Sequence, residues 1–424
     1  MRLERSDLMT RIVLQNANLV DGNSPPRRAT IVLRGDCIEA VCAEPPMAAP
    51  DDQLIDLDGR TVMPGMVLGH YHASYKDIGA VPSPFGLEAS PSLQAMRAAK
   101  NFRLALECGF TAVISAGAPH GIDAAMKAAI EEGTMVGPRI MACGRDVGTT
   151  GHGNDLSFPS YMQIGASGAV ARCDGPEEFR KAVRQEIKDG AEIIKIFATG
   201  GHGTHPPAAQ WQLSREELAA AIETANERGA KARAHIANVD AMLFAIDHGI
   251  HILDHGDGFD DACIEKCLEH GTFLAPSLHF PKVMMAIAAG SVYAEGMRPD
   301  FEWMAAILPK ANAAGVKIIL GDDYGAMGFP HGSYADELDL YVNDIGIPAV
   351  DVIRWATRYG AEAMGLGDRC GTIAPGKLAD LLVVDGDPVA DIRILRDRAK
   401  LLAIFKGGVG FKNELASLVV NGTA

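Results

Sequence analysis

The sequence lacks several features that mark common classes of protein. None of its 424 residues lie in a stretch approaching the roughly 20 consecutive apolar residues of a membrane span. Its opening residues, MRLERSDLMT, contain no apolar segment of the kind found in a secretory signal peptide. Basic residues are few, 39 against 54 acidic ones, and the net charge of −15 argues against a nucleic-acid or membrane partner. These absences predict a soluble, cytoplasmic protein.

Paired cysteines are also absent. The chain has eight cysteines but no C-x-x-C motif, so we interpret them as small core residues in a reducing compartment. No glycine-rich dinucleotide turn follows the first strand predicted in the middle of the chain, which disfavours a doubly wound open sheet. Hydrophobic residues make up 48% of the chain, which is enough for a large core.

Both ends of the chain are rich in predicted strands. Residues 11–62 alternate apolar residues with Gly and Asp turns, and a similar pattern returns in GTIAPGKLADLLVVDGDPVADI and KLLAIFKGGVGF. We therefore predict a small composite β-sandwich domain from residues 1–63 and 367–424.

The middle of the chain alternates short apolar runs with amphipathic stretches, many of which end in glycine, as helices often do. Eight such strand–helix units predict an α/β fold, a (β/α)8 TIM barrel over residues 64–366. The eight runs are VMPGMVLGHYH, FTAVISAG, PRIMACG, AEIIKIFATGG, KARAHIAN, IHILDHG, TFLAPSLHF and KIILGDDYG.

Chemically useful side chains occur where these runs end, which is where a barrel places its active site. His70 and His72 are two residues apart on the first strand and would point the same way. Lys195 is unusual, because it interrupts an apolar run where an unpartnered ammonium would be costly to bury. The other candidates follow the fifth, sixth and eighth strands: His235, His255, Asp322 and Asp323.

Each of these residues taken singly has an ordinary structural interpretation, and the argument rests on their coincidence with predicted strand ends. Further residues follow the third, fourth and eighth strands and are predicted substrate contacts, within Gly- and Pro-rich loops that would set the pocket. They are His152, His202, His205, Trp211 and His331.

Taken together, VMPGMVLGHYH, EIIKIFATGG, ARAHIAN, ILDHG, ILGDDYG, PHGSYADEL and GTIAPGKLADLLVVDGDP resemble the amidohydrolase superfamily. Within it the chain is most similar to the imidazolonepropionase-like branch that includes Xaa-Pro dipeptidases (prolidases) and related amide and carbamate hydrolases. The resemblance covers essentially the whole chain. The motif set is specific for the superfamily and much less so for a substrate.

The resemblance implies a centre of two divalent metal ions, usually zinc. His70, His72 and Asp323 would bind the more buried ion, and His235 and His255 the other. Lys195, carboxylated by carbon dioxide, would bridge both ions. Asp323 would take a proton from the bridging water and pass it to the departing amine. Relatives are frequently homo-oligomers.

The chain also departs from the family pattern. Leu68 replaces a common Asp in the first motif, and Asp254 replaces a common Glu before His255. No tyrosine follows His235, which weakens a dipeptidase interpretation. Asp322 stands where relatives carry Ser or Thr; it would either orient a neighbouring ligand or, the interpretation we favour, be a solvated neighbour.

We therefore predict a binuclear metal hydrolase that cleaves an amide bond of a small molecule, peptide-like or N-acyl amino acid. A carbamate, urea or ester hydrolase of a xenobiotic on the same centre is the alternative. A mononuclear deaminase or cyclic amidohydrolase usually lacks the bridging lysine, and an inactive scaffold would have lost ligands that are all present here.

Overall fold

The computed structural model describes residues 11–76, 89–152, 155, 168, 170–201, 207–326 and 328–419. The chain forms two compact units, which are treated separately below. The first comprises Met1–Leu68, Arg103–Ala112 and Tyr334–Ala424, and the second comprises Gly69–Phe102 and Val113–Ser333. The predicted domain bounds, 1–63 with 367–424 and 64–366, stay a prediction.

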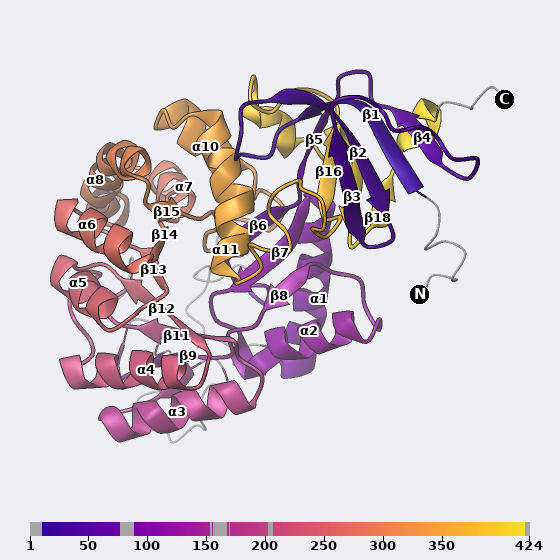
Figure 1. The fold of residues 1–424 in the computed structure, drawn as a ribbon. Coiled ribbons are helices and arrows are strands. Elements are labelled where there is room, and N and C mark those ends of the chain that lie inside the picture. The colour runs from indigo at the N-terminus through magenta and orange to yellow at the C-terminus, as the bar shows by residue number, and fades with distance from the viewer. Residues whose placement is uncertain are drawn as a thin grey trace. The chain divides into compact units, whose positions relative to one another are not determined.

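The first unit contains a sheet built from both ends of the chain. Its order is β18-β17-β16-β5-β1-β2-β3, and β4 pairs with β1. Val62 on β5 pairs with Val383 on β16, which joins the two ends, and Figure 1 shows these strands side by side. The strands are β1 (Arg11–Leu19), β2 (Arg27–Arg34), β3 (Cys37–Cys42), β4 (Gln53–Asp56), β5 (Thr61–Pro64), β16 (Leu381–Val384), β17 (Leu401–Lys406) and β18 (Val409–Asn413).

Burial explains why this sheet needs both chain ends. Leu14, Ile31, Leu381 and Phe405 all belong to one buried apolar cluster. Neither end could bury this set alone, because each contributes only part of the shared core. Three short helices also belong to this unit: α9 (Asp336–Asp339), α10 (Ala349–Arg354) and α11 (Gly360–Ala363).

Parallel strands form the sheets that carry the candidate residues. One sheet has the order β10-β9-β11-β12-β13-β14-β15 and another β6-β7-β8. Their strands are β6 (Met66–Tyr71), β7 (Phe110–Ser115), β8 (Arg139–Met141), β9 (Asp146–Gly148), β10 (Val170–Arg172), β11 (Ile193–Phe197), β12 (Lys231–Ile236), β13 (Ile252–His255), β14 (Phe273–Ala275) and β15 (Lys317–Ile318).

Helices separate most of these strands, and local sequence explains where several begin. Ser214 and Glu217 form a reciprocal capping box at one helix start, while Asn238 and Asp260 cap the next two. Figure 1 shows α3 to α6 in a row along β11 to β13. The helices are α1 (Pro91–Glu107), α2 (Ile122–Glu131), α3 (Pro176–Lys188), α4 (Arg215–Glu227), α5 (Val239–Asp247), α6 (Asp261–His270), α7 (His279–Ile287) and α8 (Val292–Ala314).

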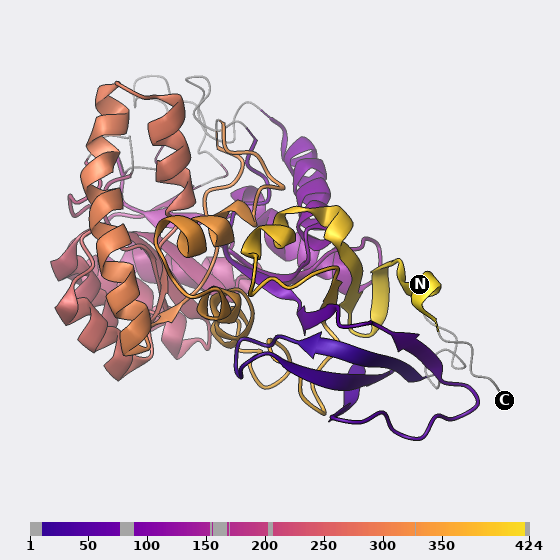
Figure 2. The same ribbon diagram turned by 90° about the horizontal axis from the view of Figure 1, so that it is seen from above.

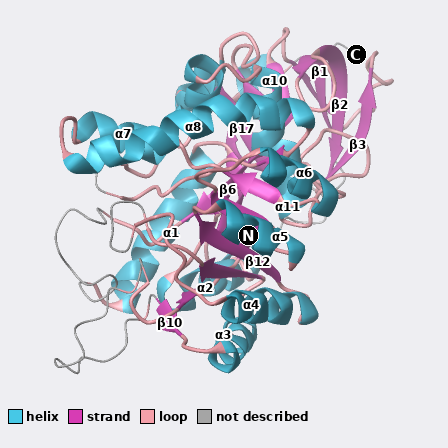
Figure 3. Ribbon diagram, turned by 90° about the vertical axis from the view of Figure 1, so that its left-hand side faces the viewer, coloured by secondary structure: helices cyan, strands magenta, loops and turns pink. Residues whose placement is uncertain are grey.

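Each of the eight predicted apolar runs contains a strand, so the α/β prediction with parallel strands is confirmed. The insert predicted near residues 280–315 is the pair α7 and α8, which run side by side in Figure 2. Helices α3 and α4 are likewise neighbours in Figure 3. None of the described helices combines the length and the apolar character needed to cross a membrane.

Most of the cysteines are core residues, as their spacing predicted. All eight are free, and six of them are buried.

Candidate metal centre and active site

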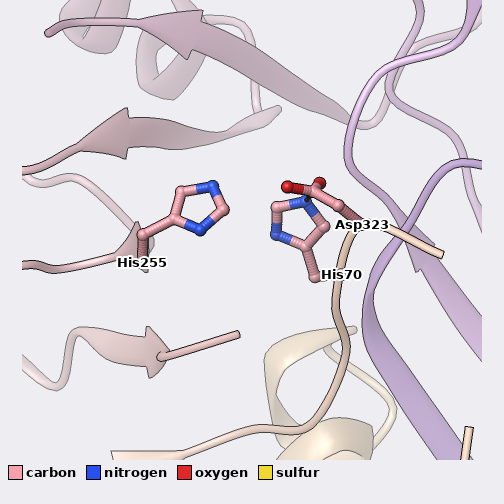
Figure 4. Close-up of side chains that lie close together, drawn as sticks. All are labelled: His70, His255 and Asp323. Atoms are coloured by element: carbon pink, nitrogen blue, oxygen red, sulfur yellow. Dashed lines mark hydrogen bonds and ion pairs between the residues drawn. The ribbon is translucent and has the colours of Figure 1, made fainter. Parts of the chain in front are cut away.

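Three side chains from different strands converge at one point. His70 lies on β6, His255 ends β13, and Asp323 follows β15, yet ligand atoms of all three lie within 4.8 Å of one another. Figure 4 shows the two imidazoles and the carboxylate facing a common space. The carboxyl ends of parallel strands meet at one edge of a sheet, so residues far apart in the sequence are brought together.

The Nδ1 atoms of His70 and His72 contact other groups of the protein, and these contacts indicate which nitrogen of each ring carries the proton and which carries the lone pair. The Nδ1 of His72 lies 3.0 Å from the carbonyl oxygen of Gly117, which can only accept, so Nδ1 carries the proton. The Nδ1 of His70 lies 3.1 Å from Oδ1 of Asp254 and 3.3 Å from Nη2 of Arg233. The nearer partner is an ionised carboxylate, which can only accept, so the proton of His70 is assigned to Nδ1 as well. In both rings the lone pair is therefore on Nε2.

The two Nε2 atoms and one carboxylate oxygen form a compact set of donors. The Nε2 atoms of His70 and His72 lie 3.2 Å apart. Oδ1 of Asp323 lies 3.0 Å from Nε2 of His70 and 3.3 Å from Nε2 of His72. Ligands about 2.0–2.1 Å from a tetrahedral zinc ion would be about 3.3 Å from one another. Three electron-rich atoms at this spacing repel unless a cation lies between them, so this donor set fits a metal ion.

His235 and His255 extend the cluster. Nε2 of His235 donates to the carbonyl oxygen of Gly200 at 2.7 Å, which leaves the lone pair on Nδ1. The ring centroid of His255 lies 4.5 Å from that of His235 and 5.3 Å from that of His70. His255 also has a positive φ of 67°, a conformation that is uncommon for non-glycine residues.

Lys195 has a carboxylate partner in the structure. Its side chain is 3% exposed, and its Nζ lies 2.6 Å from Oδ2 of Asp254, which is itself fully buried. Burial alone would raise the pKa of Asp254, but the charges of Arg233 and Lys195 hold it well below its usual value. Asp254 is therefore an anion that contacts both Lys195 and the candidate ligand His70.

Sequence reasoning missed Arg233 and gave Asp254 too little weight. Arg233 lies two residues before His235 on β12, so the alternation of strand side chains places both on one face. The alternation of side chains along a strand was applied only to histidines; applied to charged residues as well, it would have identified Arg233.

Two aromatic rings next to the candidate ligands were also missed. Tyr75 stacks on His72 with centroids 4.0 Å apart, and Phe197 stacks on His235 at 4.2 Å. Phe197 lies two residues after Lys195 on β11, which is a signal that the sequence contains. Each stacked ring restricts the rotation of the imidazole that it covers.

Asp322 is not a solvated neighbour, so the interpretation favoured from the sequence is wrong. The residue is fully buried. One oxygen accepts from the backbone N–H of Asp323 at 2.7 Å and the other from that of Phe280 at 2.9 Å. Asp322 therefore ties the start of α7 to the backbone that carries Asp323.

We expect Asp322→Ala to lower the free energy of unfolding by about 2–4 kcal/mol, because two backbone donors lose their acceptor in the interior. Urea unfolding followed by circular dichroism measures the change. Asp261→Ala is the control, since its ion pair with Lys310 is exposed and is worth about 1 kcal/mol at most. Equal losses in both variants would contradict this role.

The predicted substrate contacts lie in different surroundings. His152 is buried beside Phe197, with centroids 5.0 Å apart, and His331 places Nε2 3.2 Å from the carbonyl oxygen of Tyr75. The indole of Trp211 donates to Asn238 at 3.0 Å. His202 and His205 lie outside the described residues. A role in substrate binding stays a prediction for all five.

Burial lowers the pKa of His331 to about 4. The folded protein keeps this ring neutral, whereas an unfolded histidine binds a proton below about pH 6.5, so acid favours unfolding. We expect His331 to contribute up to about 3 kcal/mol of destabilisation, which develops between pH 6.5 and pH 4 and is absent above it.

His331→Gln tests this contribution in protein stripped of metal by a chelator. The unfolding free energy of the variant should fall less steeply than that of the wild type between about pH 7 and about pH 4. Parallel curves for the two proteins would show that this ring does not titrate as expected.

The chain is similar in sequence and in structure to known hydrolases. The family model described as "Amidohydrolase family" matches residues 61–423. An ochratoxinase from Aspergillus niger is 28% identical over 371 residues, which cover 83% of this chain and 75% of that protein. A crystal structure of a Xaa-Pro dipeptidase with bound methionine superposes with a TM-score of 0.84 at 28% identity, covering 95% of this chain and 100% of that one. A prolidase complexed with N-methylphosphonate-L-proline gives 0.82 at 30% identity, with the same coverage.

Proposed function

Because the chain belongs to the amidohydrolase family, we propose that it hydrolyses an amide bond, peptide-like or in an N-acyl amino acid, at a binuclear metal centre. Membership confirms the predicted family and the prediction of a metal-dependent enzyme that hydrolyses C–N bonds. The observation that carries the proposal is the set of lone pairs on His70, His72 and Asp323, which lie 3.0–3.3 Å apart.

In this proposal the candidate residues divide between two zinc ions. His70, His72 and Asp323 would hold one ion, His235 and His255 would hold the other, and a carboxylated Lys195 would supply a ligand to both. When bound, the ions supply a Lewis acid and a hydroxide at neutral pH.

The side chains around the ligands perform the remaining tasks. Asp254, Gly117 and Gly200 accept from His70, His72 and His235 and so hold each ring in one tautomer. The carboxyl group of an aspartate ordinarily ionises near about pH 4, well below neutral pH. Asp323 is thus a carboxylate at neutral pH, able to take a proton from water and pass it to the leaving amine.

The proposal also includes the fold around the site, a closed (β/α)8 barrel. Two parallel sheets would be arcs of one (β/α)8 barrel, and the two chain ends would form a β-sandwich. The backbone N–H of Gly69 on β6 donates to the carbonyl oxygen of Leu320, and that of Glu192 donates to Ala142 at 2.7 Å. These bonds join the first strand to the eighth and the third to the fourth, as closure requires. We further propose a cytoplasmic homo-oligomer.

The relatives favour an amide over other bonds. The ochratoxinase, the Xaa-Pro dipeptidase and the prolidase are among the proteins that the chain resembles over most of its length. Residues 236–238 read Ile-Ala-Asn and hold no tyrosine, so an N-acyl amino acid is a better candidate than a dipeptide.

A substrate panel and a metal analysis test the proposal together. The protein is reconstituted with zinc, its zinc content is measured, and N-acyl amino acids, Xaa-Pro dipeptides and aryl carbamates are assayed. About two zinc ions per chain with turnover of N-acyl amino acids or dipeptides would support it. Turnover of carbamates alone would overturn the amide assignment, and about one zinc ion per chain would overturn the binuclear centre.

A further inference from the structure

The guanidinium of Arg233 lies inside the second unit, where it is fully buried. Its Nε donates to Oδ2 of Asp254 at 3.0 Å, and its Nη2 donates to Oδ1 of the same carboxylate. Its Nη1 donates to the carbonyl oxygens of Gly69 at 2.9 Å and Ser115 at 3.0 Å. Arg233 thus joins Asp254 to the strands β6 and β7.

Two positively charged side chains, those of Arg233 and Lys195, contact the single carboxylate of Asp254. Its two oxygens receive both arms of the Arg233 fork, and Oδ2 also receives Nζ of Lys195 at 2.6 Å. Because the fork alone contacts both oxygens, the carboxylate stays paired when Lys195 is withdrawn. His70 then still has its acceptor in Oδ1.

We propose that Arg233 is a positioning residue that holds Asp254 on His70 without help from Lys195, and thereby releases Lys195 to react with carbon dioxide. This inference rests on the proposed function, since it concerns the lysine that would bridge the two ions. In the reaction the ammonium first loses one proton to water. The neutral lysine nitrogen then forms a bond to the carbon of carbon dioxide, one C=O π bond opens to give the carboxylate, and a second N–H proton is lost to water. A positive side chain becomes a negative one.

That change of sign explains why a second cation is needed. Without Arg233, Lys195 would be the sole described cation in contact with Asp254, and its carboxylation would leave a buried carboxylate unpaired beside a new anion. An uncompensated buried charge is strongly destabilising, so the lysine would remain an ammonium paired with Asp254. Arginine suits the task because its planar fork binds both oxygens and remains charged.

Three variants test the charge of Arg233 separately from its packing. Zinc-loaded proteins are equilibrated with ¹³C-bicarbonate, and the carbamate signal is measured by ¹³C NMR alongside zinc content and circular dichroism. Arg233→Gln keeps hydrogen-bond donors but removes the charge, and we expect the carbamate signal to fall about tenfold or more. Arg233→Lys restores a charge and should keep most of the signal. The double variant R233Q/D254N removes the anion that holds Lys195 and should also keep most of it.

The outcomes separate this inference from the proposed function. A wild-type signal that persists in Arg233→Gln would overturn the inference alone. So would equal loss in all three variants, which would make Arg233 a packing residue. Absence of the signal from the wild type would overturn the bridging lysine of the proposed function and the inference with it. If Arg233→Gln does not fold, loss of the signal from the folded double variant overturns the inference.

Discussion

Lys195→Ala is expected to lower turnover by at least about a thousandfold, beyond the 10–100-fold typical of residues that only support a ligand. Alanine has no nitrogen to carboxylate, so the proposed bridge between the two ions cannot form. Zinc content should fall with activity, because one ligand is lost from both ions. Turnover is assayed on whichever member of the substrate panel the wild type cleaves, and zinc is measured on the same samples.

Lys231→Ala is the matched control for this experiment. Lys231 begins β12, the strand next to Lys195, and lies half-buried. We expect it to keep zinc content and turnover near the wild-type values. Near-normal turnover in Lys195→Ala would exclude a bridging role for that lysine.

Asp323→Asn is expected to lower turnover by about 10²–10⁴-fold while keeping much of the bound zinc. Asparagine keeps an oxygen near His70 and His72, but an amide cannot accept and return a proton at neutral pH. Metal analysis and turnover on the same sample separate the two roles that we propose for this carboxylate. Loss of zinc in proportion to activity would mean that Asp323 acts as a ligand only.

The neighbouring aspartate provides the control. Asp322→Asn changes the same kind of side chain one residue away, where it accepts from the backbone N–H groups of Asp323 and Phe280. We expect a lower unfolding midpoint but a loss of turnover within about tenfold. Equal losses of turnover in the two variants would place the proton-transfer role in doubt.

The sequence predicted the parts of the site that follow from periodicity. Strand side chains alternate, so His70 and His72 had to face one way, and strand-end positions pointed to Lys195, His235 and His255. The same periodicity marked Arg233, whose charge no sequence argument connected to a partner. Asp254 was visible only as a departure from a family motif.

The partners of these residues depended on the tertiary structure, because they come from strands distant in the chain. Asp254 lies 184 residues from His70 and 59 from Lys195, and the Nη1 contact between Arg233 and Gly69 spans 164 residues. Local periodicity shows which way each side chain points but says nothing of what it meets across parallel strands.

The sequence by itself therefore determined the α/β class, the family and the set of candidate ligands, since these follow from apolar spacing and from motifs contained in single strands. Only the tertiary structure decided that Asp322 is a buried backbone acceptor and that two cations share Asp254. The physical reason is that burial and charge pairing arise when the strand ends pack together, so the energy of each group depends on neighbours that its own segment does not contain.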